Sequence, residues 1–252
     1  MNFTDKIVLI TGASRGIGRA IAVQFAERGA TIAIHYNSNE AAAQETLALL
    51  ESDGHSIVQA EIADADAVKN MIDVVVEQHG RLDVLVNNAG IYDEHPIADT
   101  SYDDWQQIWA RTLNVNLIGA ANAMYCAAQV MMEQGGGRIV NVSSRGAFRG
   151  EPTAPAYGAS KAGMNAMSQS LAKTLAPHNI YVGTVAPGFV STDMAAGILA
   201  SERGDEIRNQ SPLKRVATPD EVAYAVLFLA SDGAEFSTGT IIDVNGASYL
   251  RS

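Results

Sequence analysis

The stretch KIVLITGASRGIGRA, residues 6–20, decides the fold. A run of aliphatic residues passes directly into three glycines, Gly12, Gly16 and Gly18, and then into a helical pattern. Such glycines let the chain turn tightly, let the backbone approach a pyrophosphate and let the helix pack close to the sheet, while the helix N-terminus offers free N–H groups to phosphates. A glycine triplet between a strand and a helix predicts a dinucleotide site, whereas elsewhere it would indicate only a tight turn.

The rest of the chain alternates short β-branched runs with longer helical patterns. The expected strands are 6–10, 31–35, 56–62, 83–87, 137–143, 180–186 and 239–245. The expected helices are about 18–28, 40–52, 66–78, 102–134, one around Tyr157, and 220–230. This alternation predicts right-handed βαβ units, and hence an α/β fold with a mostly parallel seven-stranded sheet covered by helices on both faces. No linker or repeat divides the chain, so one domain is expected over 1–252.

Composition narrows the classes of partner. The formal net charge of −11 argues against nucleic acid and anionic membranes, which attract basic surfaces. No unbroken apolar run reaches the roughly 18 residues of a membrane span, and the N-terminus has no signal-peptide pattern. The single cysteine, Cys126, excludes an internal disulfide and suits a reducing cytoplasm, where we expect the protein. No metal site is expected.

The segment 189–218 interrupts the regular alternation. It is long, mixed in pattern and follows the end of a strand, where open α/β sheets bind ligands. We expect a mobile substrate-binding lid here. The alternative is a helical insertion on the surface.

The choice of nicotinamide cofactor is a question of charge. Sites for NAD usually carry a carboxylate on the ribose about 20 residues after the glycines, and it would repel a 2′-phosphate. Here Tyr36, Asn37 and Ser38 follow the second strand, with no acid before Glu40. Arg15 offers a cation, unless it is only a solvated loop residue, so the sequence favours NADP(H) and leaves NAD(H) as the alternative.

A second motif, AYGASKAG at 156–163, places Tyr157 four positions before Lys161. On a helix these side chains point the same way, as a chance surface pair or as a proton donor beside a cation. A neighbouring cation favours the phenolate, so Lys161 is expected to lower the pKa of Tyr157 from its ordinary value near ~10.

Five motifs in order, TGASRGIG, NNAG (87–90), SS (143–144), YGASK (157–161) and PG (187–188), carry a resemblance that covers the whole chain. The sequence resembles the short-chain dehydrogenase/reductase family, and most of all its branch of 3-oxoacyl-(acyl-carrier-protein) reductases. The resemblance implies a Rossmann-like doubly wound domain and a homotetramer. It also implies that NAD(P)(H) is used to interconvert a carbonyl and an alcohol.

The resemblance also assigns roles to residues. Tyr157 matches the catalytic acid/base and Lys161 its partner, Ser144 matches the catalytic serine, and Asn116 matches the asparagine that would hold the lysine through water. The residues expected at the cofactor are Gly12, Ser14, Arg15, Gly16, Ile17, Gly18, Tyr36, Asn37, Ser38, Glu61, Ile62, Asn88, Ala89, Gly90, Tyr157, Lys161, Pro187, Gly188, Val190 and Thr192. Glu61 is a departure, since the family usually carries aspartate near this position, and this leaves the adenine contact open.

The substrate is less determined. Gly135 and His178 stand where carrier-protein reductases have basic residues, so an acyl carrier protein is disfavoured but not excluded, while coenzyme A thioesters or free ketones need no basic patch. Arg145 and Arg149 either bind an anionic substrate group or pair with Glu151 or an acid of the lid.

The predicted function is NADPH-dependent reduction of a ketone or 3-oxoacyl thioester to a secondary alcohol, with Tyr157 as general acid. The alternative is NAD-dependent oxidation of a small secondary alcohol. An enoyl reductase of this family would space tyrosine and lysine more widely than YGASK does, and a non-catalytic binding protein would have lost the catalytic set.

Overall fold

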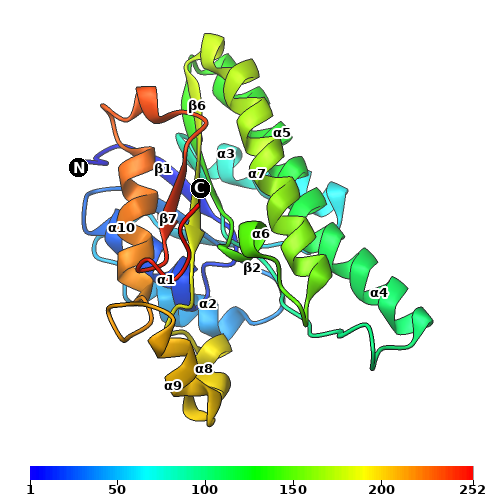
Figure 1. Ribbon diagram of the computed structural model, residues 1–252. Helices are drawn as coiled ribbons and strands as arrows, with labels where there is room; N and C mark the ends of the chain where they lie inside the picture. The colour runs from blue at the N-terminus through cyan, green and yellow to red at the C-terminus, as the bar shows by residue number, and fades with distance from the viewer. Residues whose placement is uncertain (252) are drawn as a thin grey trace.

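Seven strands form one sheet in which every neighbouring pair is parallel, in the order β3-β2-β1-β4-β5-β6-β7. The computed structural model describes residues 1–251, and at Met194 the backbone alone. The strands are β1 (Ile7–Ile10), β2 (Thr31–Tyr36), β3 (Ser56–Gln59), β4 (Val84–Asn87), β5 (Gly137–Val142), β6 (Ile180–Pro187) and β7 (Ile241–Val244). The predicted α/β fold with a seven-stranded sheet is confirmed (Figure 1).

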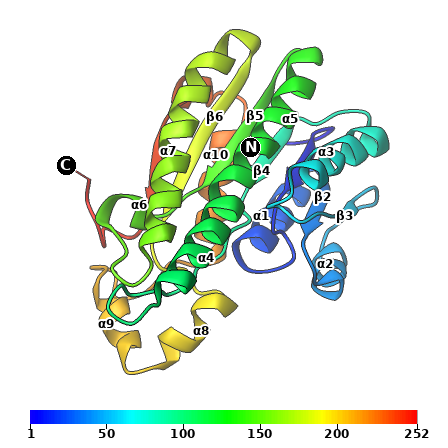
Figure 2. The same ribbon diagram turned by 90° about the vertical axis from the view of Figure 1, so that its right-hand side faces the viewer.

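Helices cover both faces of the sheet. The helices are α1 (Gly16–Ala26), α2 (Glu40–Leu47), α3 (Ala65–His79), α4 (Tyr102–Leu113), α5 (Gly119–Glu133), α6 (Gly146–Arg149), α7 (Pro155–Leu175), α8 (Asp193–Ala200), α9 (Arg203–Asn209) and α10 (Pro219–Ala230). One core lies between the sheet and α1, α2 and α10, and the other lies against α3, α5 and α7. Figure 2 shows α4, α5 and α7 together along the second face. In β1, Val8 and Ile10 enter the first core while Ile7 and Leu9 enter the second, as the period of two requires.

The long helix expected over 102–134 is interrupted. Residues Asn114–Ile118 form a π-helical turn between α4 and α5. Such turns insert one extra residue per turn and re-aim the side chains around them, which periodicity in the sequence does not reveal. The interruption carries Asn116, one of the predicted site residues.

The continuous helical run Tyr102–Glu133 has the length and composition of a membrane span. The sequence shows no unbroken apolar run of this length, because polar residues interrupt the segment. However, 44% of its apolar window is buried inside the protein. Its α5 part lies in the core with α3 and α7. We therefore interpret it as the core helix of an α/β domain.

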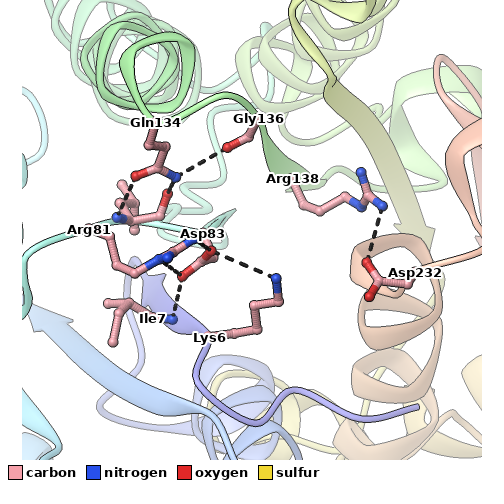
Figure 3. Close-up of polar contacts among 9 residues, drawn as sticks. Lys6, Ile7, Arg81, Asp83, Gln134, Gly136, Arg138 and Asp232 are labelled. Atoms are coloured by element: carbon pink, nitrogen blue, oxygen red, sulfur yellow. Dashed lines mark hydrogen bonds and ion pairs between the residues drawn. The ribbon is translucent and has the colours of Figure 1, made fainter.

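The amino ends of the strands are fastened by a buried carboxylate. Asp83 accepts hydrogen bonds from the Ile7 N–H (2.9 Å) and from the Arg81 guanidinium (2.9 and 2.6 Å), and Lys6 lies 3.9 Å away. Figure 3 shows these contacts beside the Gln134 amide, which binds the backbone around Leu82. This network joins β1 and β4 at the edge opposite the predicted site, so Asp83 has a structural role.

The segment 189–218 contains α8 and α9 and joins the rest of the protein at a narrow base. Val190 and Ala217 form a parallel bridge, the Ser191 N–H donates to Ala217 O (2.8 Å), and the Ala217 N–H donates to Phe189 O (3.0 Å). The two helices project below the sheet in Figure 1. A hinged lid would have this connectivity, and its movement remains a prediction.

Candidate active site

The predicted site residues come from the carboxyl ends of neighbouring strands. β1 leads into the glycine loop, β4 into Asn88, β5 into Ser144, and β6 into Gly188. Because the strands are parallel, these ends share one edge of the sheet. The strand order reverses between β1 and β4, and doubly wound folds bind ligands at such a reversal.

The glycine loop has the geometry of a phosphate cradle. Gly12 and Gly16 have φ of 64° and 55°, in the left-handed region that favours glycine. A Cβ on Gly18 would collide with the Gly12 carbonyl oxygen and lie 2.6 Å from Asn88 Nδ2. α1 begins at Gly16 with no acidic residue in its first turn and no side chain capping its N–H groups. The residues therefore fit a dinucleotide pyrophosphate at a helix N-terminus.

Side chains of α1 and α2 also hold the glycine loop. The Ser14 carbonyl accepts hydrogen bonds from Arg19 Nη2 (2.7 Å) and Thr46 Oγ1 (3.0 Å). Arg15 is exposed and forms no ion pair with any residue of the described chain. The sequence analysis missed the positioning roles of Arg19 and Thr46, because both look like ordinary helix residues.

His35, on β2, is a further residue that the sequence analysis missed. Its ring is 1% exposed, Nδ1 accepts the Gly12 N–H (3.0 Å), and Nε2 lies 3.0 Å from the Ala60 carbonyl. Because Nδ1 accepts this hydrogen bond, it carries no proton, and the neutral ring has its proton on Nε2. Burial lowers the pKa of His35, which keeps the ring neutral.

The end of β2 differs from the expectation in one respect. The Asn37 amide donates to Glu61 Oε2 (3.0 Å), and both side chains are exposed. The preference for NADP(H) inferred from the sequence requires that no carboxylate lie beside Asn37. The structure corrects this assumption, since Glu61 reaches the position from the end of the neighbouring β3, which sequence distance along β2 could not show.

The turn after β4 is built on Thr11. Its hydroxyl accepts the N–H groups of Asn88 (2.9 Å) and Ala89 (3.0 Å), while the Asn88 amide donates back to the carbonyls of Thr11 and Gly12. The predicted cofactor residues of β1 and β4 are thereby joined in one rigid unit.

Asn116 is fully buried and binds backbone. Its amide donates to Ile91 O (2.9 Å) and accepts the Ile91 N–H (2.8 Å), and Nδ2 lies 3.2 Å from Ser160 Oγ. A Cβ on Gly90 would meet both Asn116 Oδ1 (3.2 Å) and Lys161 Nζ (3.5 Å). The π-helical turn thus brings Asn116, Gly90 and Lys161 together.

Ser144 and Tyr157 form the hydroxyl pair of the site. Ser144 follows β5, and its Oγ accepts the Gly146 N–H (3.0 Å). Tyr157 lies in the first turn of α7, which Pro155 begins with the fixed φ that suits this position. Burial raises the pKa of Tyr157 to about 12, although the neighbouring Ser144 hydroxyl opposes the rise. The sequence predicts the opposite direction.

Lys161 explains this difference. Its ammonium donates to the Val142 carbonyl (2.8 Å), and Nζ lies 5.8 Å from the centroid of the Tyr157 ring. The two side chains share one face of α7 as predicted, but the cation is held against β5 rather than against the phenolic oxygen. Burial lowers the pKa of Lys161 to about 8, because its ammonium has left water.

Tyr92 and His95, for which the sequence predicts no role, contact the first turn of α7. The Tyr92 ring packs edge-on against Tyr157, with ring centroids 5.0 Å apart. His95 is 1% exposed, and its Nε2 accepts the N–H of Ala156 (3.2 Å), the residue before Tyr157. Because α7 has no side-chain cap of its own, His95 supplies an acceptor for its first turn.

The segment after β6 closes the cofactor cradle. A Cβ on Gly16 would lie 3.4 Å from Thr192 Cγ2, so Thr192, one of the residues predicted at the cofactor, lies beside the glycine loop. Val190 is buried, and Pro187 ends β6. Beyond the end of β3, the Ile62 carbonyl leaves no room for a side chain at Gly119. The predicted cofactor residue Ile62 therefore packs directly against the start of α5.

The two arginines after Ser144 have different partners. Arg149 lies 3.4 Å from the Glu151 carboxylate, one of the two pairings considered from the sequence. Arg145 is 3% exposed and donates to two neutral oxygens, Ser248 Oγ and Gln210 Oε1. Its positive charge meets no carboxylate within ion-pair distance in the described part of the chain.

Comparison with known proteins agrees with this geometry. A family model described as Enoyl-(Acyl carrier protein) reductase matches residues 12–247. The 3-oxoacyl-[acyl-carrier-protein] reductase FabG of Staphylococcus aureus is 40% identical over 247 residues, covering 97% of this chain and 98% of that protein. A solved short-chain type dehydrogenase/reductase from Mycobacterium ulcerans superposes with a TM-score of 0.90 at 31% identity, covering 100% of this chain and 92% of that one.

The chain belongs to the short-chain dehydrogenase/reductase family. It is an oxidoreductase of this family, acting between CH–OH and C=O with a nicotinamide cofactor. A putative short-chain alcohol dehydrogenase from Sinorhizobium meliloti gives the same TM-score of 0.90 at 35% identity, covering 98% of this chain and 97% of that one. An uncharacterized oxidoreductase of Thermotoga maritima is 40% identical over 256 residues, covering 98% of this chain and 99% of that protein.

Proposed function

We propose that this enzyme uses NADPH to reduce a 3-oxoacyl thioester or related ketone to a secondary alcohol. The observation that carries the proposal is that Ser144, Tyr157 and Lys161 lie together at the strand edge that holds the glycine cradle. The similarity to 3-oxoacyl-[acyl-carrier-protein] reductases supports the acyl substrate class.

In this reaction the bound cofactor supplies a hydride to the carbonyl carbon. Negative charge then develops on the carbonyl oxygen, and Ser144 is placed to donate a hydrogen bond to it; such a donor contributes about 2.7–4 kcal/mol of transition-state stabilisation. Tyr157 gives that oxygen its proton. Family resemblance assigns Lys161 as the partner of Tyr157, and its Nζ lies 5.8 Å from the centroid of the Tyr157 ring.

The similarity to 3-oxoacyl-[acyl-carrier-protein] reductases favours reduction over oxidation. The pKa of Tyr157, raised by burial to about 12, keeps the hydroxyl protonated at neutral pH, which is the form that a general acid needs. The NAD-dependent alcohol dehydrogenase alternative therefore has the weaker support.

The proposed preference for NADPH rests on Arg15, which is exposed and without an ion-pair partner in residues 1–251. Arginine binds phosphate with several N–H groups at once, and Asn37 and Ser38 add donors nearby. The Glu61 carboxylate, which binds Asn37, would repel a 2′-phosphate. Glu61→Gln is therefore expected to tighten NADPH binding, while Arg15→Gln weakens it and leaves NADH binding nearly unchanged. Equal effects of Arg15→Gln on both cofactors would overturn the assignment.

The proposal extends to assembly and substrate delivery. The net charge of −11 disfavours an acidic carrier protein as the obligatory partner, so we propose that the acyl group also reacts as a coenzyme A or smaller thioester. Family resemblance supports a homotetramer, and the single cysteine supports a cytoplasmic enzyme.

A substrate panel tests the function. The purified enzyme is given NADPH or NADH with the same acyl chain as a 3-oxoacyl thioester, a 2-enoyl thioester and a free ketone, and nicotinamide absorbance reports turnover. The proposal expects oxidation of NADPH with the 3-oxoacyl thioester and none with the enoyl thioester. Reduction of the enoyl thioester alone, or a preference for NADH, would overturn it.

A further inference from the structure

A small cavity lies at the base of the segment 189–218, where the end of α9, the start of α10 and the end of β7 come together (Figure 1). Its volume is about 100 Å³, which corresponds to roughly three water molecules at liquid density. The residues that line it include Arg145 but none of the four predicted catalytic residues.

Within residues 1–251, the lining of the cavity carries one positive charge without an ion-pair partner. Two arginines line the cavity. Arg215 forms an ion pair with Glu221, whose two carboxylate oxygens it binds at 2.7 and 2.6 Å. This pairing holds the pKa of Glu221 at about 2. Among the described residues, Arg145 is left with uncharged partners, namely the polar groups of Ser248 and Gln210 and the ring of Phe189.

A buried guanidinium without a counter-ion is costly, because its charge has lost water and gained no anion. Arg145 is 3% exposed, and burial lowers its pKa to about 10. Two of its five N–H groups donate to Ser248 and Gln210, so donors remain for a further acceptor. These features point to an anion as the missing partner.

The walls of the cavity indicate the kind of anion. Phe189, Ile207, Leu213 and Val244 contribute apolar side chains to the lining, and the Phe189 ring lies against the guanidinium, with its centroid 5.3 Å from Arg145 Cζ. A planar guanidinium pairs best with a planar carboxylate, and an apolar wall favours a short alkyl group over a fully hydrated phosphate. One net positive charge matches a monoanion.

We propose that this cavity is a binding site for a short-chain monocarboxylate, held by Arg145 and separate from the position of the reacting carbonyl. The bound carboxylate joins three parts of the chain, since Arg145 follows Ser144 and contacts both the end of α9 through Gln210 and the C-terminal segment through Ser248. Its occupancy therefore stabilises the closed base of the 189–218 segment.

Thermal unfolding of the whole protein tests the site. Melting temperature is measured against increasing acetate and propionate, with acetamide as the uncharged isostere and sodium chloride at matched ionic strength. At a ligand concentration ten times Kd, binding to the folded state alone raises Tm by about 3–6 °C. Acetate and propionate are expected to give this saturable rise, propionate at lower concentration, while acetamide and chloride give none.

Variants locate the effect. Arg145→Met is expected to abolish the rise, whereas Arg149→Met, which changes a neighbouring exposed arginine paired with Glu151, is expected to retain it. If Arg145→Met does not fold, the wild-type comparison of acetate with acetamide decides alone. No rise with either carboxylate, an equal rise with chloride, or a full rise in Arg145→Met would overturn the proposal.

Discussion

Acidification is expected to loosen the cofactor cradle through His35. The neutral ring accepts the Gly12 N–H through Nδ1 and donates from Nε2 to Ala60 O. Protonation places a second N–H against Gly12 and leaves a buried donor unsatisfied, which costs about 1–3 kcal/mol. If the loop must recover its geometry to bind the dinucleotide, this corresponds to about a 5- to 150-fold loss of affinity.

The sign follows from the direction of the pKa shift. Burial lowers the pKa of His35 below 6.5 in the folded protein, and the hydrogen bond to Ala60 and the Glu61 charge oppose this only in part. The unfolded chain therefore binds the proton more readily than the folded one. The contribution of neutral His35 to folding stability is therefore complete above pH 6.5 and is lost as pH falls through the folded-state pKa. Cofactor affinity is expected to fall over the same acid range.

The assay is titration of NADPH binding, by nicotinamide fluorescence, across the acid range, with denaturant unfolding in parallel. His35→Asn offers an amide oxygen near the position of Nδ1 and cannot titrate, so its affinity is expected to vary much less with pH. His79→Asn is the matched control, because burial also lowers the pKa of His79 but this residue binds Ser56, away from the cradle. Unchanged pH dependence in His35→Asn would refute the reasoning.

Three further substitutions have expected outcomes. Gly18→Ala drives a Cβ into the Gly12 carbonyl, so NADPH affinity should fall at least tenfold in a fluorescence titration; wild-type affinity would contradict the close packing. Asp83→Asn removes the charge that binds Ile7 and Arg81, so the free energy of unfolding measured in urea should fall by about 1.5–3 kcal/mol while kcat is retained. A selective loss of kcat would argue against a structural role for Asp83. His95→Ala frees the Ala156 N–H at the start of α7, so kcat should fall severalfold while the NADPH Kd holds, and a change confined to Kd would be inconsistent with this.

The sequence was informative wherever backbone constraint determines the structure. The glycines of residues 12–18, the alternation of strands and helices and the spacing of Tyr157 and Lys161 each depend on local geometry, and the sheet and shared helix face agree with them. Helix ends were less accurate: α1 runs over Gly16–Ala26 where 18–28 was expected, and α2 ends at Leu47 rather than near Ser52.

Contacts between distant segments could not be predicted in this way. Glu61 reaches Asn37 from the neighbouring strand, His35 supports Gly12, and Arg145 turns toward Ser248. The pKa of Tyr157 was expected to fall because Lys161 is near in sequence, but burial has the larger effect and the ammonium binds Val142. Burial and the choice among competing acceptors are properties of the assembled fold.

The central claim is that the Tyr157 hydroxyl protonates the carbonyl oxygen while the rest of the site binds the cofactor. Single-turnover reduction by Tyr157→Phe, compared with the wild type at equal NADPH saturation, tests it most directly. The account predicts that the rate of the chemical step falls at least 100-fold, the order of magnitude that general acid catalysis contributes. It also predicts an NADPH Kd within about threefold of the wild type, which corresponds to less than about 1 kcal/mol of binding free energy. A rate near that of the wild type with the phenolic oxygen removed would contradict it.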